Sequence, residues 1–413
     1  MNIGIVVIGF NRPDALNRLL KSLNYANYGN HKDITLIISL DYSGKNDCYK
    51  VSDLFNWKFG EKIIINHPYN LGLKEHVISC GNLSSEYDAI IMLEDDLFVS
   101  PDFFHYCLNV VNHYQYCADI GGFSLYSYTF IEGVSIPFLP VNNGFDNYFM
   151  KFPGSRGQIW TSEQWGLFRN FLVESEISDT DFKILPKFAQ NWPTKSSWKK
   201  LFFLYLISCN KYIVYPRVSL TTNFGDVGEH YKIATSSLHV PLLFGDKSWN
   251  FSSVNNVKLF YDSWFELEPI AFNSIFEQSV IDDLTIDLRG TKDMDEIKTK
   301  YLLSIKECSQ ALSKYSIELL PIELNVLLGF NESNSENLIS FGLAENFKFE
   351  TNFSKKYFNS FKISMRSYPS DYESLIRREI LELKEYKLGK FLLTPLIILK
   401  RLLSKISARY INR

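Results

Sequence analysis

The chain has 413 residues, of which 46% are hydrophobic, and this is enough for a sizeable core and for two or three domains. Its 43 basic and 46 acidic residues give a formal net charge of −3, and this slightly acidic balance argues against nucleic acid as the main partner. No apolar run approaches the roughly 20 residues that a membrane-spanning helix needs.

The first residues of the chain indicate its cellular compartment. The sequence opens on an apolar strand, Ile3 to Ile8, without the basic start and small-residue cleavage site of a signal peptide. The six cysteines show no CxxC spacing, which favours reduced thiols. We therefore expect a cytoplasmic protein.

A glycine-containing turn follows the first strand. Its sequence is Gly9-Phe10-Asn11-Arg12-Pro13, and apolar residues at helical spacing come after it, from Ala15 to Leu23. Because the turn lacks the GxGxxG pattern, a dinucleotide-binding fold of the dehydrogenase type has no support. The pattern predicts a strand, a tight turn and a helix that begins near Pro13.

Two further strands lead to polar residues. The strand from Ile34 to Leu40 ends on Asp41, and the strand from Lys62 to Asn66 leads into the stretch from His67 to Lys74. The Asp41 carboxylate could accept hydrogen bonds from a ribose or a base, or could simply form an Asx turn, and the residue alone favours neither. The alternation of strands and helices predicts right-handed βαβ units and an α/β fold with a mostly parallel sheet flanked by helices.

The most informative stretch is an apolar run that ends on three carboxylates. Five consecutive apolar residues, Ala89 to Leu93, predict a strand buried on both faces, and Glu94, Asp95 and Asp96 follow it. Ligands bind at this end of the strands in open α/β sheets. Oxygen ligands of this kind suit Mg²⁺ or Mn²⁺, which commonly bind through one or two carboxylates plus substrate phosphates. The alternative is a solvated acidic turn, although Ser100-Pro101 predicts a tight connection to a helix.

These motifs together resemble the nucleotide-binding half of GT-A glycosyltransferases. The phrase from Leu93 to Phe104 is, more narrowly, similar to N-acetylglucosaminyltransferase I and its bacterial relatives, and the resemblance covers roughly residues 1–232. In this superfamily the acidic motif binds a divalent metal that bridges the diphosphate of a nucleotide-sugar. The resemblance implies that Asp96 is the direct metal ligand. It implies contacts to the nucleotide-sugar from Gly9, Asn11, Arg12, Asp41, Asn70, Gly72, Lys74, Glu94, Asp95 and Arg156.

A second loop, from Phe152 to Gly157, contains two glycines that can bring backbone close to a ligand. Thr161 and Gln164 fit a capping box, so a helix is expected to start there. Glu163 lies in its first turn, where the helix dipole alone would explain a carboxylate, and where it could also lie at the mouth of the sheet. The N-acetylglucosaminyltransferase I family has a similar Phe-Pro-Gly phrase before a helix that shapes its donor and acceptor pocket.

The catalytic base is harder to assign. The resembling family carries an acidic residue beside a Trp in the corresponding region, whereas Lys199 and Lys200 follow Trp198 in this chain. The candidate substitutes are Glu163, Asp181 and Asp179, and we favour Glu163 and then Asp181. Trp198 could stack on a sugar ring or pack in the core.

A strand from Lys211 to Pro216 leads to a loop with two glycines, two acids and a histidine, Ser219 to His230. Such a loop suits closure over a diphosphate. GT-A enzymes often take a further metal ligand from a C-terminal histidine, so the resemblance makes His230 a candidate. A structural role for this histidine is the alternative.

The resemblance fades beyond Phe265. We expect a catalytic domain at residues 1–265, a small α+β accessory domain at 266–375 and a basic amphipathic helical tail at 376–413. The tail alternates basic residues with apolar runs, a composition typical of a helix that lies on an anionic membrane surface. Docking on the protein's own body is the alternative.

The sequence therefore predicts a metal-dependent glycosyltransferase that uses a nucleotide-sugar, UDP-linked, and Mn²⁺ or Mg²⁺ as cofactor. The resemblance implies an inverting reaction, and the tail suggests a glycan or lipid-linked glycan acceptor in bacterial capsule or lipopolysaccharide synthesis, at the inner face of the membrane. Two alternatives are a sugar nucleotidyltransferase and a catalytically silent glycan-binding scaffold. The first usually has a Gly-rich N-terminal phosphate loop, which the Gly9 to Pro13 turn matches poorly.

Overall fold

The computed structural model describes residues 1–134, 136–228, 235–331 and 338–349. The described residues belong to one compact unit. The predicted amphipathic tail at residues 376–413 and the predicted ligand His230 lie outside the described residues, so both remain predictions.

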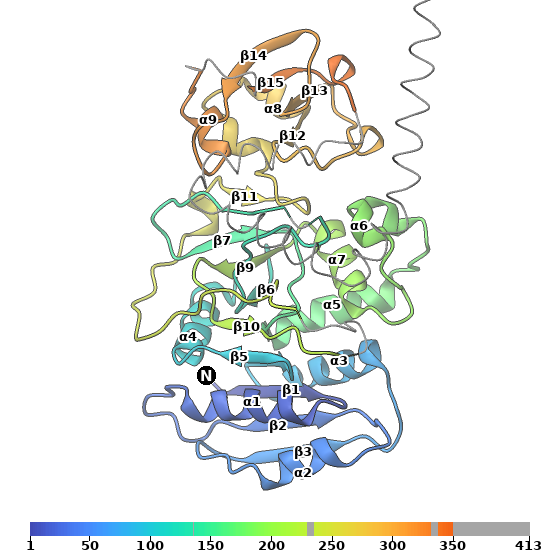
Figure 1. Ribbon diagram of the computed structural model, residues 1–413, viewed down its shortest axis with the longest axis vertical. Helices are drawn as coiled ribbons and strands as arrows, with labels where there is room; N and C mark the ends of the chain where they lie inside the picture. The colour runs from blue at the N-terminus through green and yellow to red at the C-terminus, as the bar shows by residue number, and fades with distance from the viewer. Residues whose placement is uncertain (135, 229–234, 332–337, 350–413) are drawn as a thin grey trace, which may run out of the picture. The chain divides into compact units, whose positions relative to one another are not determined.

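A nine-stranded mixed sheet forms the centre of the first unit (Figure 1). Its strands, in spatial order, are β11 (Phe260–Tyr261), β7 (Asn147–Met150), β9 (Tyr212–Pro216), β6 (Ile120–Ser124), β8 (Gln158–Thr161), β4 (Ala89–Glu94), β1 (Ile3–Gly9), β2 (Leu36–Leu40) and β3 (Lys62–Asn66). The strands from β4 to β3 are all parallel, and β8 is inserted antiparallel between β4 and β6. This confirms the predicted α/β fold with a large, mostly parallel sheet.

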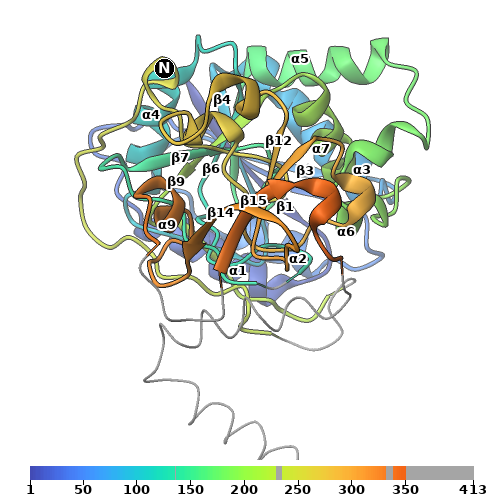
Figure 2. The same ribbon diagram turned by 90° about the horizontal axis from the view of Figure 1, so that it is seen from above.

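Helices cover both faces of this sheet. On one face, α1 (Pro13–Tyr25), α2 (Asp47–Leu54) and α4 (Phe103–Tyr114) contribute to a core that includes alternate residues of β1 and β4. On the other face lie α3 (Leu73–Asn82), α5 (Ser162–Glu174) and α7 (Trp198–Ser208); Figure 2 shows α5 and α1 on opposite sides of the strands. Both faces of β1 and β4 are therefore buried, which explains their unbroken apolar sequence.

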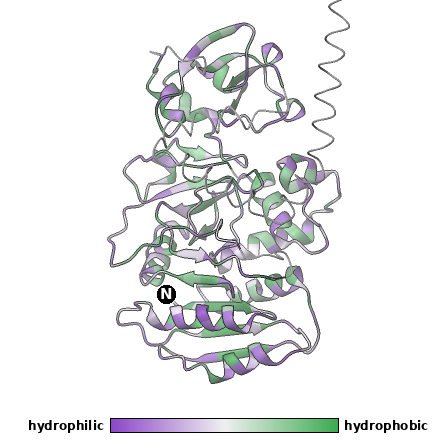
Figure 3. Cartoon of the chain, in the orientation of Figure 1, coloured by the Kyte–Doolittle hydropathy of each residue, from purple (hydrophilic) through white to green (hydrophobic). Residues whose placement is uncertain are grey.

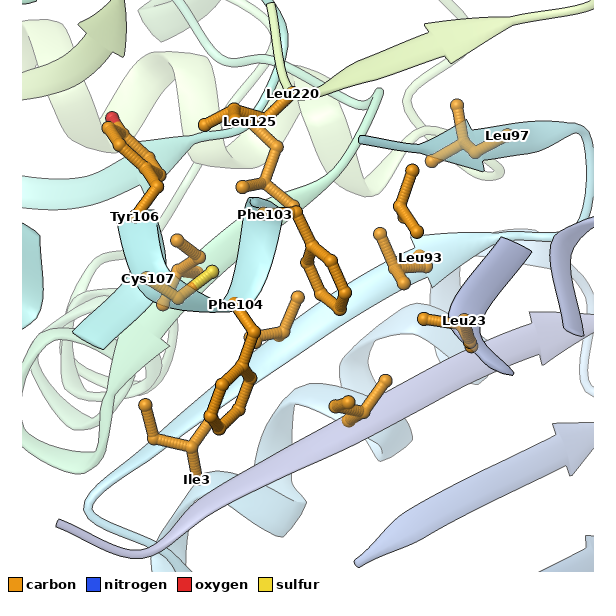
Figure 4. Close-up of a cluster of buried hydrophobic side chains, with 14 of the residues drawn as sticks. Ile3, Leu23, Leu93, Leu97, Phe103, Phe104, Tyr106, Cys107, Leu125 and Leu220 are labelled. Atoms are coloured by element: carbon orange, nitrogen blue, oxygen red, sulfur yellow. The ribbon is translucent and has the colours of Figure 1, made fainter. Parts of the chain in front are cut away.

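The core beneath α1, α2 and α4 contains side chains from several elements. Figure 4 shows Phe103 of α4 near Leu93 of β4, and Phe104 of α4 near Ile3 of β1. Hydropathy colouring shows hydrophilic and hydrophobic residues alternating along α1, as expected for a helix with one buried side (Figure 3).

The opposite face is rich in tryptophan. Trp160 of β8 lies 4.8 Å from Trp165 of α5 and 5.9 Å from Trp198 of α7, measured between ring centroids. Gly81 of α3 permits this packing, because a Cβ there would lie only 2.0 Å from the Trp165 ring. Trp198 is therefore a core residue and not a platform for a sugar ring.

The chain beyond the acidic triplet differs from the sequence prediction. Asp95 and Asp96 lead first into a short strand, β5 (Leu97–Val99), which pairs antiparallel with β10 (Thr221–Asn223). The helix α4 begins only at Phe103, with Asp102 and not Ser100 at its N-cap position. The Ser100 hydroxyl instead donates to the Leu243 carbonyl at 2.6 Å.

A separate four-stranded sheet follows the main one. Its order is β12 (Leu284–Asp287), β13 (Tyr301–Ser304), β15 (Leu338–Leu343) and β14 (Ala311–Ser316). The remaining short helices are α6 (Lys187–Gln190), α8 (Gln278–Ile281) and α9 (Glu323–Leu327), with 3-10 turns at Leu83–Glu86, Asp181–Ile184, Val254–Asn256, Pro269–Phe272, Met294–Glu296 and Ala344–Asn346. This small sheet lies in the region where the sequence predicts an α+β accessory domain, and it belongs to the same compact unit as the main sheet. The bounds of that domain stay a prediction.

A buried ion cluster joins this small sheet to the end of the main one. Arg289 donates to Glu266 and to Glu323, each at 2.7 Å, and the Arg289 guanidinium lies 5.3 Å from the ring centroid of Phe138. All three charged side chains are at most 1% exposed. Charges this deeply buried are tolerated only as complete pairs.

The helices and the cysteines bear on two sequence predictions, the lack of a membrane-spanning segment and the presence of reduced thiols. Across the described ranges, no helix is long and apolar enough to cross a membrane. All six cysteines are free thiols; Cys48, Cys80 and Cys107 are buried, and Cys209 is exposed.

Candidate active site

The three carboxylates lie at the edge where parallel strands end. Glu94 is the last residue of β4, and Asp95 and Asp96 form the turn before β5. The parallel register that pairs Ile8 with Glu94 brings the end of β1, and with it Arg12, to the same edge. The sequence prediction of a ligand-binding edge at this point agrees with the topology.

Arg12 holds the two aspartates together. Its guanidinium forms a short ion pair through Nη2 with Asp95 Oδ1, and Nη1 lies 3.0 Å from Asp96 Oδ2. Burial raises the pKa of Asp95 to about 6, although Arg12 opposes the shift. Burial and then the Asp96 charge raise the pKa of Glu94 to about 8. Burial disfavours the charged form of Arg12, yet Asp95 and Asp96 raise its pKa above the ordinary value.

Each aspartate keeps one oxygen unused by Arg12. Asp95 Oδ2 and Asp96 Oδ1 are buried and accept no hydrogen bond from the described residues. A buried carboxylate oxygen without a partner is costly, so these atoms suit a cation or a ligand donor.

The residues at this edge can hold a divalent metal only if a ligand completes its coordination. Within the ranges that the structure describes, no group of three or more His, Cys, Asp or Glu side chains is arranged to hold a metal. Two carboxylates are nevertheless sufficient where substrate phosphates complete the coordination, which is the usual mode for Mg²⁺. Asp96 and Asp95 could therefore hold a metal together with a bound diphosphate.

Asp41 organises the neighbouring strand end. Its Oδ1 accepts from the backbone N–H groups of Tyr42 and Leu71, both at 2.8 Å, and its Oδ2 accepts from Gly72 at 3.0 Å. The Asn70 side chain donates to the Tyr42 carbonyl at 3.0 Å. The Asp41 carboxylate therefore fixes residues 71 and 72 against the end of β2, and its contact to a nucleoside stays a prediction.

Three other predicted contacts lie around this edge. Gly9 ends β1, and its carbonyl accepts from the Asp41 N–H at 3.0 Å; a Cβ at Gly9 would lie 2.9 Å from Leu40 Cδ2. Asn11 lies in the turn before α1, and Lys74 lies in the first turn of α3, 3.3 Å from Glu75 Oε1.

Arg156 belongs to a second ion cluster beside Glu94. The antiparallel pairing of Met92 with Gln158 brings the residues before β8 alongside the end of β4. Arg156 is buried and donates through Nη1 to Tyr128 Oη at 3.1 Å and to Glu132 Oε2 at 3.0 Å. Burial alone would raise the pKa of Glu132, but Lys199 and Arg156 lower it to about 2.

Glu132 is the functional candidate that the sequence prediction missed. Lys199, which replaces the acid expected after Trp198, forms a short ion pair with Glu132 Oε1. The chain therefore supplies a carboxylate beside Lys199 from the loop after β6. Lys200 is turned away and donates to the carbonyls of Gln190 and Trp192.

The structure places Glu163, the favoured base, away from this edge. The pairing of Ala89 with Thr161 places the start of α5, and so the exposed Glu163, at the opposite end of β4 from Glu94. The Thr161–Gln164 capping box is present, as predicted. Asp181 is exposed, and its Oδ2 accepts from the Ser178 N–H and hydroxyl at 2.7 Å each. We therefore do not retain Glu163 as the base, and the assignment of Asp181 stays a prediction.

The segment after β10 lies against Arg12. The Phe224 N–H donates to the Asp96 carbonyl at 3.0 Å, and Arg18 of α1 forms a short ion pair with Asp226 while stacking on the Phe224 ring. A Cβ at Gly228 would lie 3.4 Å from Arg12 Nη1. The loop that follows β10 thus contacts both the acidic turn and Arg12.

His76, a buried histidine near Asp41, allows a prediction of how the stability of the protein depends on pH. His76 Nε2 lies 2.8 Å from Ser39 Oγ, and burial lowers the His76 pKa from 6.5 to about 4; nearby Asp41 opposes the shift and His67 adds to it. Between these two values the unfolded chain binds more protons, so stability falls as the pH drops from about 6.5 to about 4, by up to ~3 kcal/mol.

Urea unfolding of the wild type and of His76→Gln at about pH 7 and about pH 4.5 checks this prediction. The free energy of unfolding of the wild type should fall more than that of the variant. Equal losses in the two proteins would show that His76 does not titrate in this way.

The chain was compared with curated proteins, with solved structures and with models of protein families. No curated protein matches the chain. Among solved structures, S. aureus TarS residues 1–349 in complex with UDP-GlcNAc is similar, with a TM-score of 0.37 and 14% identity over 56% of this chain and 60% of that chain. The TarS 1–349 structure titled without a ligand gives 0.35 and 12% over 54% and 60%. The mannosyltransferase PcManGT from Pyrobaculum calidifontis, in complex with GDP-Man and Mn²⁺, gives 0.30 and 7% over 45% and 52%.

The chain thus spans 60% of the length of the TarS 1–349 chains. Residues 4–161 match the model of the family described as Glycosyl transferase family 2. The match extends from β1 to the last residue of β8 and includes Arg12, Asp41, the acidic turn and Arg156. Residues 4–161, which include the parallel strands β1 to β4, are therefore similar to the domain of glycosyltransferase family 2.

Proposed function

We propose that the protein is a metal-dependent glycosyltransferase that transfers a sugar from a nucleotide-sugar, UDP-linked, to an acceptor hydroxyl. The observation that carries this proposal is the pair of buried, unpartnered oxygens on Asp95 and Asp96 at the end of β4. This pair lies inside the segment that matches the glycosyltransferase family model. Buried oxygens of this kind need a positively charged or hydrogen-bonding ligand.

The residues around the acidic turn would bind different parts of the nucleotide-sugar. Asp96 and Asp95 would hold Mn²⁺ or Mg²⁺ together with the donor phosphates, and the bound metal would neutralise charge on the departing diphosphate as a Lewis acid. Asp41 fixes the turn that carries Asn70 and Gly72, the predicted contacts to the nucleoside. Arg12, in the turn between β1 and α1, would donate to phosphate oxygens.

Glu132, Arg156 and Lys199 form an ion cluster beside Glu94, at the end of β4. Glu132 is kept ionised by Lys199 and Arg156, and it fixes both cations beside Glu94. We infer that this cluster positions the transferred sugar or the acceptor. A carboxylate with so low a pKa is a weak proton acceptor, so we assign Glu132 a positioning role and not that of the base.

The acceptor and the location are proposed from the sequence alone. We propose a glycan or lipid-linked glycan as acceptor, inversion at the anomeric carbon, and a role in bacterial surface polysaccharide synthesis at the inner face of the membrane. The resemblance to the N-acetylglucosaminyltransferase I family and the basic apolar composition of residues 376–413 support this part of the proposal.

A donor screen tests the proposal without knowledge of the acceptor. The protein should slowly hydrolyse one nucleotide-sugar in the presence of Mn²⁺, and chelation of the metal should abolish the hydrolysis. A sugar nucleotidyltransferase would instead consume a nucleoside triphosphate and release pyrophosphate. A silent scaffold would hydrolyse nothing, and its melting temperature would not rise with Mn²⁺ and UDP. Either of these two results would contradict the proposal.

A further inference from the structure

Arg12 satisfies the two carboxylates that the proposed function assigns to the metal. Its two terminal nitrogens each take one oxygen, from Asp95 and from Asp96, so the fork of one guanidinium spans both acids. The Arg12 side chain is 23% exposed, whereas those of Asp95 and Asp96 are 4% and 13% exposed. The cation therefore reaches the acids from the more open side.

A metal ion approaching these acids alone would meet this guanidinium. The two unpartnered oxygens, Asp95 Oδ2 and Asp96 Oδ1, belong to the same carboxylates that Arg12 already engages. Two positive charges that share two carboxylates repel each other strongly at a partly buried site. Metal binding in the absence of another anion is therefore opposed by Arg12.

A diphosphate changes this balance. Phosphate oxygens accept the planar guanidinium fork in the same paired geometry as carboxylates, so a bound diphosphate offers Arg12 an alternative partner. Once Arg12 has moved to the phosphates, the oxygens that it held, Asp95 Oδ1 and Asp96 Oδ2, are released and the repulsion of the metal falls.

We propose that Arg12 is an internal competitor of the metal, which couples metal binding to binding of the nucleoside diphosphate. In the ligand-free protein Arg12 neutralises Asp95 and Asp96, and the diphosphate draws it away. Metal and nucleotide then strengthen each other's binding by the same factor, because such coupling is reciprocal. This inference rests on the proposed function, since it takes the metal and the diphosphate as the ligands of the site.

The test measures Mn²⁺ affinity and not activity. Free Mn²⁺ is titrated by electron paramagnetic resonance against the full-length wild type and Arg12→Gln, with and without UDP. We expect Arg12→Gln to bind Mn²⁺ alone about 10- to 100-fold more tightly than the wild type, as loss of a charge-assisted contact implies. UDP should strengthen Mn²⁺ binding more in the wild type than in the variant.

Arg18→Gln is the matched control. Arg18 lies on the same helix and is 25% exposed, but it pairs with Asp226 and not with the acidic turn. Loss of its charge should change Mn²⁺ affinity by less than about threefold, which separates direct competition from a general field effect. Arg12→Lys keeps the charge without the fork and should give an intermediate Mn²⁺ affinity; it also provides a second reading if Arg12→Gln folds poorly.

The possible failures are distinguishable. If the wild type binds Mn²⁺ with UDP but neither Arg12 variant binds Mn²⁺ alone more tightly than Arg18→Gln does, the competition is wrong and the proposed function stands. If no protein binds Mn²⁺ or UDP under any condition, both the competition and the proposed function are wrong.

Discussion

Asp96→Asn is expected to lower the Mn²⁺-dependent hydrolysis of the donor by about 10²–10³-fold in kcat. The amide keeps the size of the side chain but removes the negative charge on the buried, unpartnered Oδ1. Metal stabilisation of a developing charge contributes several kcal/mol, and each 1.36 kcal/mol corresponds to about tenfold in rate. Steady-state kinetics at saturating donor, with Mn²⁺ varied, gives the comparison.

Glu163→Gln is the control for this variant. Glu163 is exposed in the first turn of α5, at the opposite end of β4, and its loss should change kcat by less than about twofold. A large loss in Glu163→Gln together with a mild effect of Asp96→Asn would reverse the assignment of the site to the acidic turn.

Arg289→Ala is expected to destabilise the protein by about 3–5 kcal/mol, the usual cost of breaking a buried ion cluster by removing one partner. The substitution would leave Glu266 and Glu323 buried without their shared cation. Burial already raises the pKa of Glu266 to about 7 even though Arg289 opposes the shift. The free energy of unfolding from urea titration measures the loss.

Two further variants make this prediction specific. Lys187→Ala removes a solvent-exposed ion pair with Asp293 and Asp295 and should leave the stability unchanged. Combining Arg289→Met with Glu266→Gln and Glu323→Gln removes all three charges and should recover part of the loss. An Arg289→Ala protein as stable as Lys187→Ala would show that the cluster does not hold the small sheet in place.

Local patterns predicted the first half of the main sheet well. The strand from Ala89 could be read from an apolar run without alternation, and the capping box at Thr161 and Gln164 from two residues at fixed spacing. Both patterns involve residues close together in the sequence, so they could be recognised without knowledge of the rest of the fold. The edge that carries Asp95 and Asp96 followed because parallel strands end together.

The failures all depended on contacts distant in sequence. Glu163 was expected at the mouth of the sheet, but β8 runs antiparallel to β4, and strand direction is not written in the apolar pattern of four residues. The strand β5 was missed because its partner, β10, lies more than a hundred residues later in the sequence. Glu132 was missed because it lies in an irregular loop without periodicity, where only the tertiary fold brings it to Lys199.

A crystal of the protein soaked with Mn²⁺ and UDP tests the central claim most directly. We expect metal density beside the Asp96 carboxylate, with UDP phosphate oxygens completing the coordination and the Arg12 guanidinium turned towards the diphosphate. An acidic turn without metal density, with Asp95 and Asp96 still paired to Arg12 and UDP absent or bound elsewhere, would contradict the account.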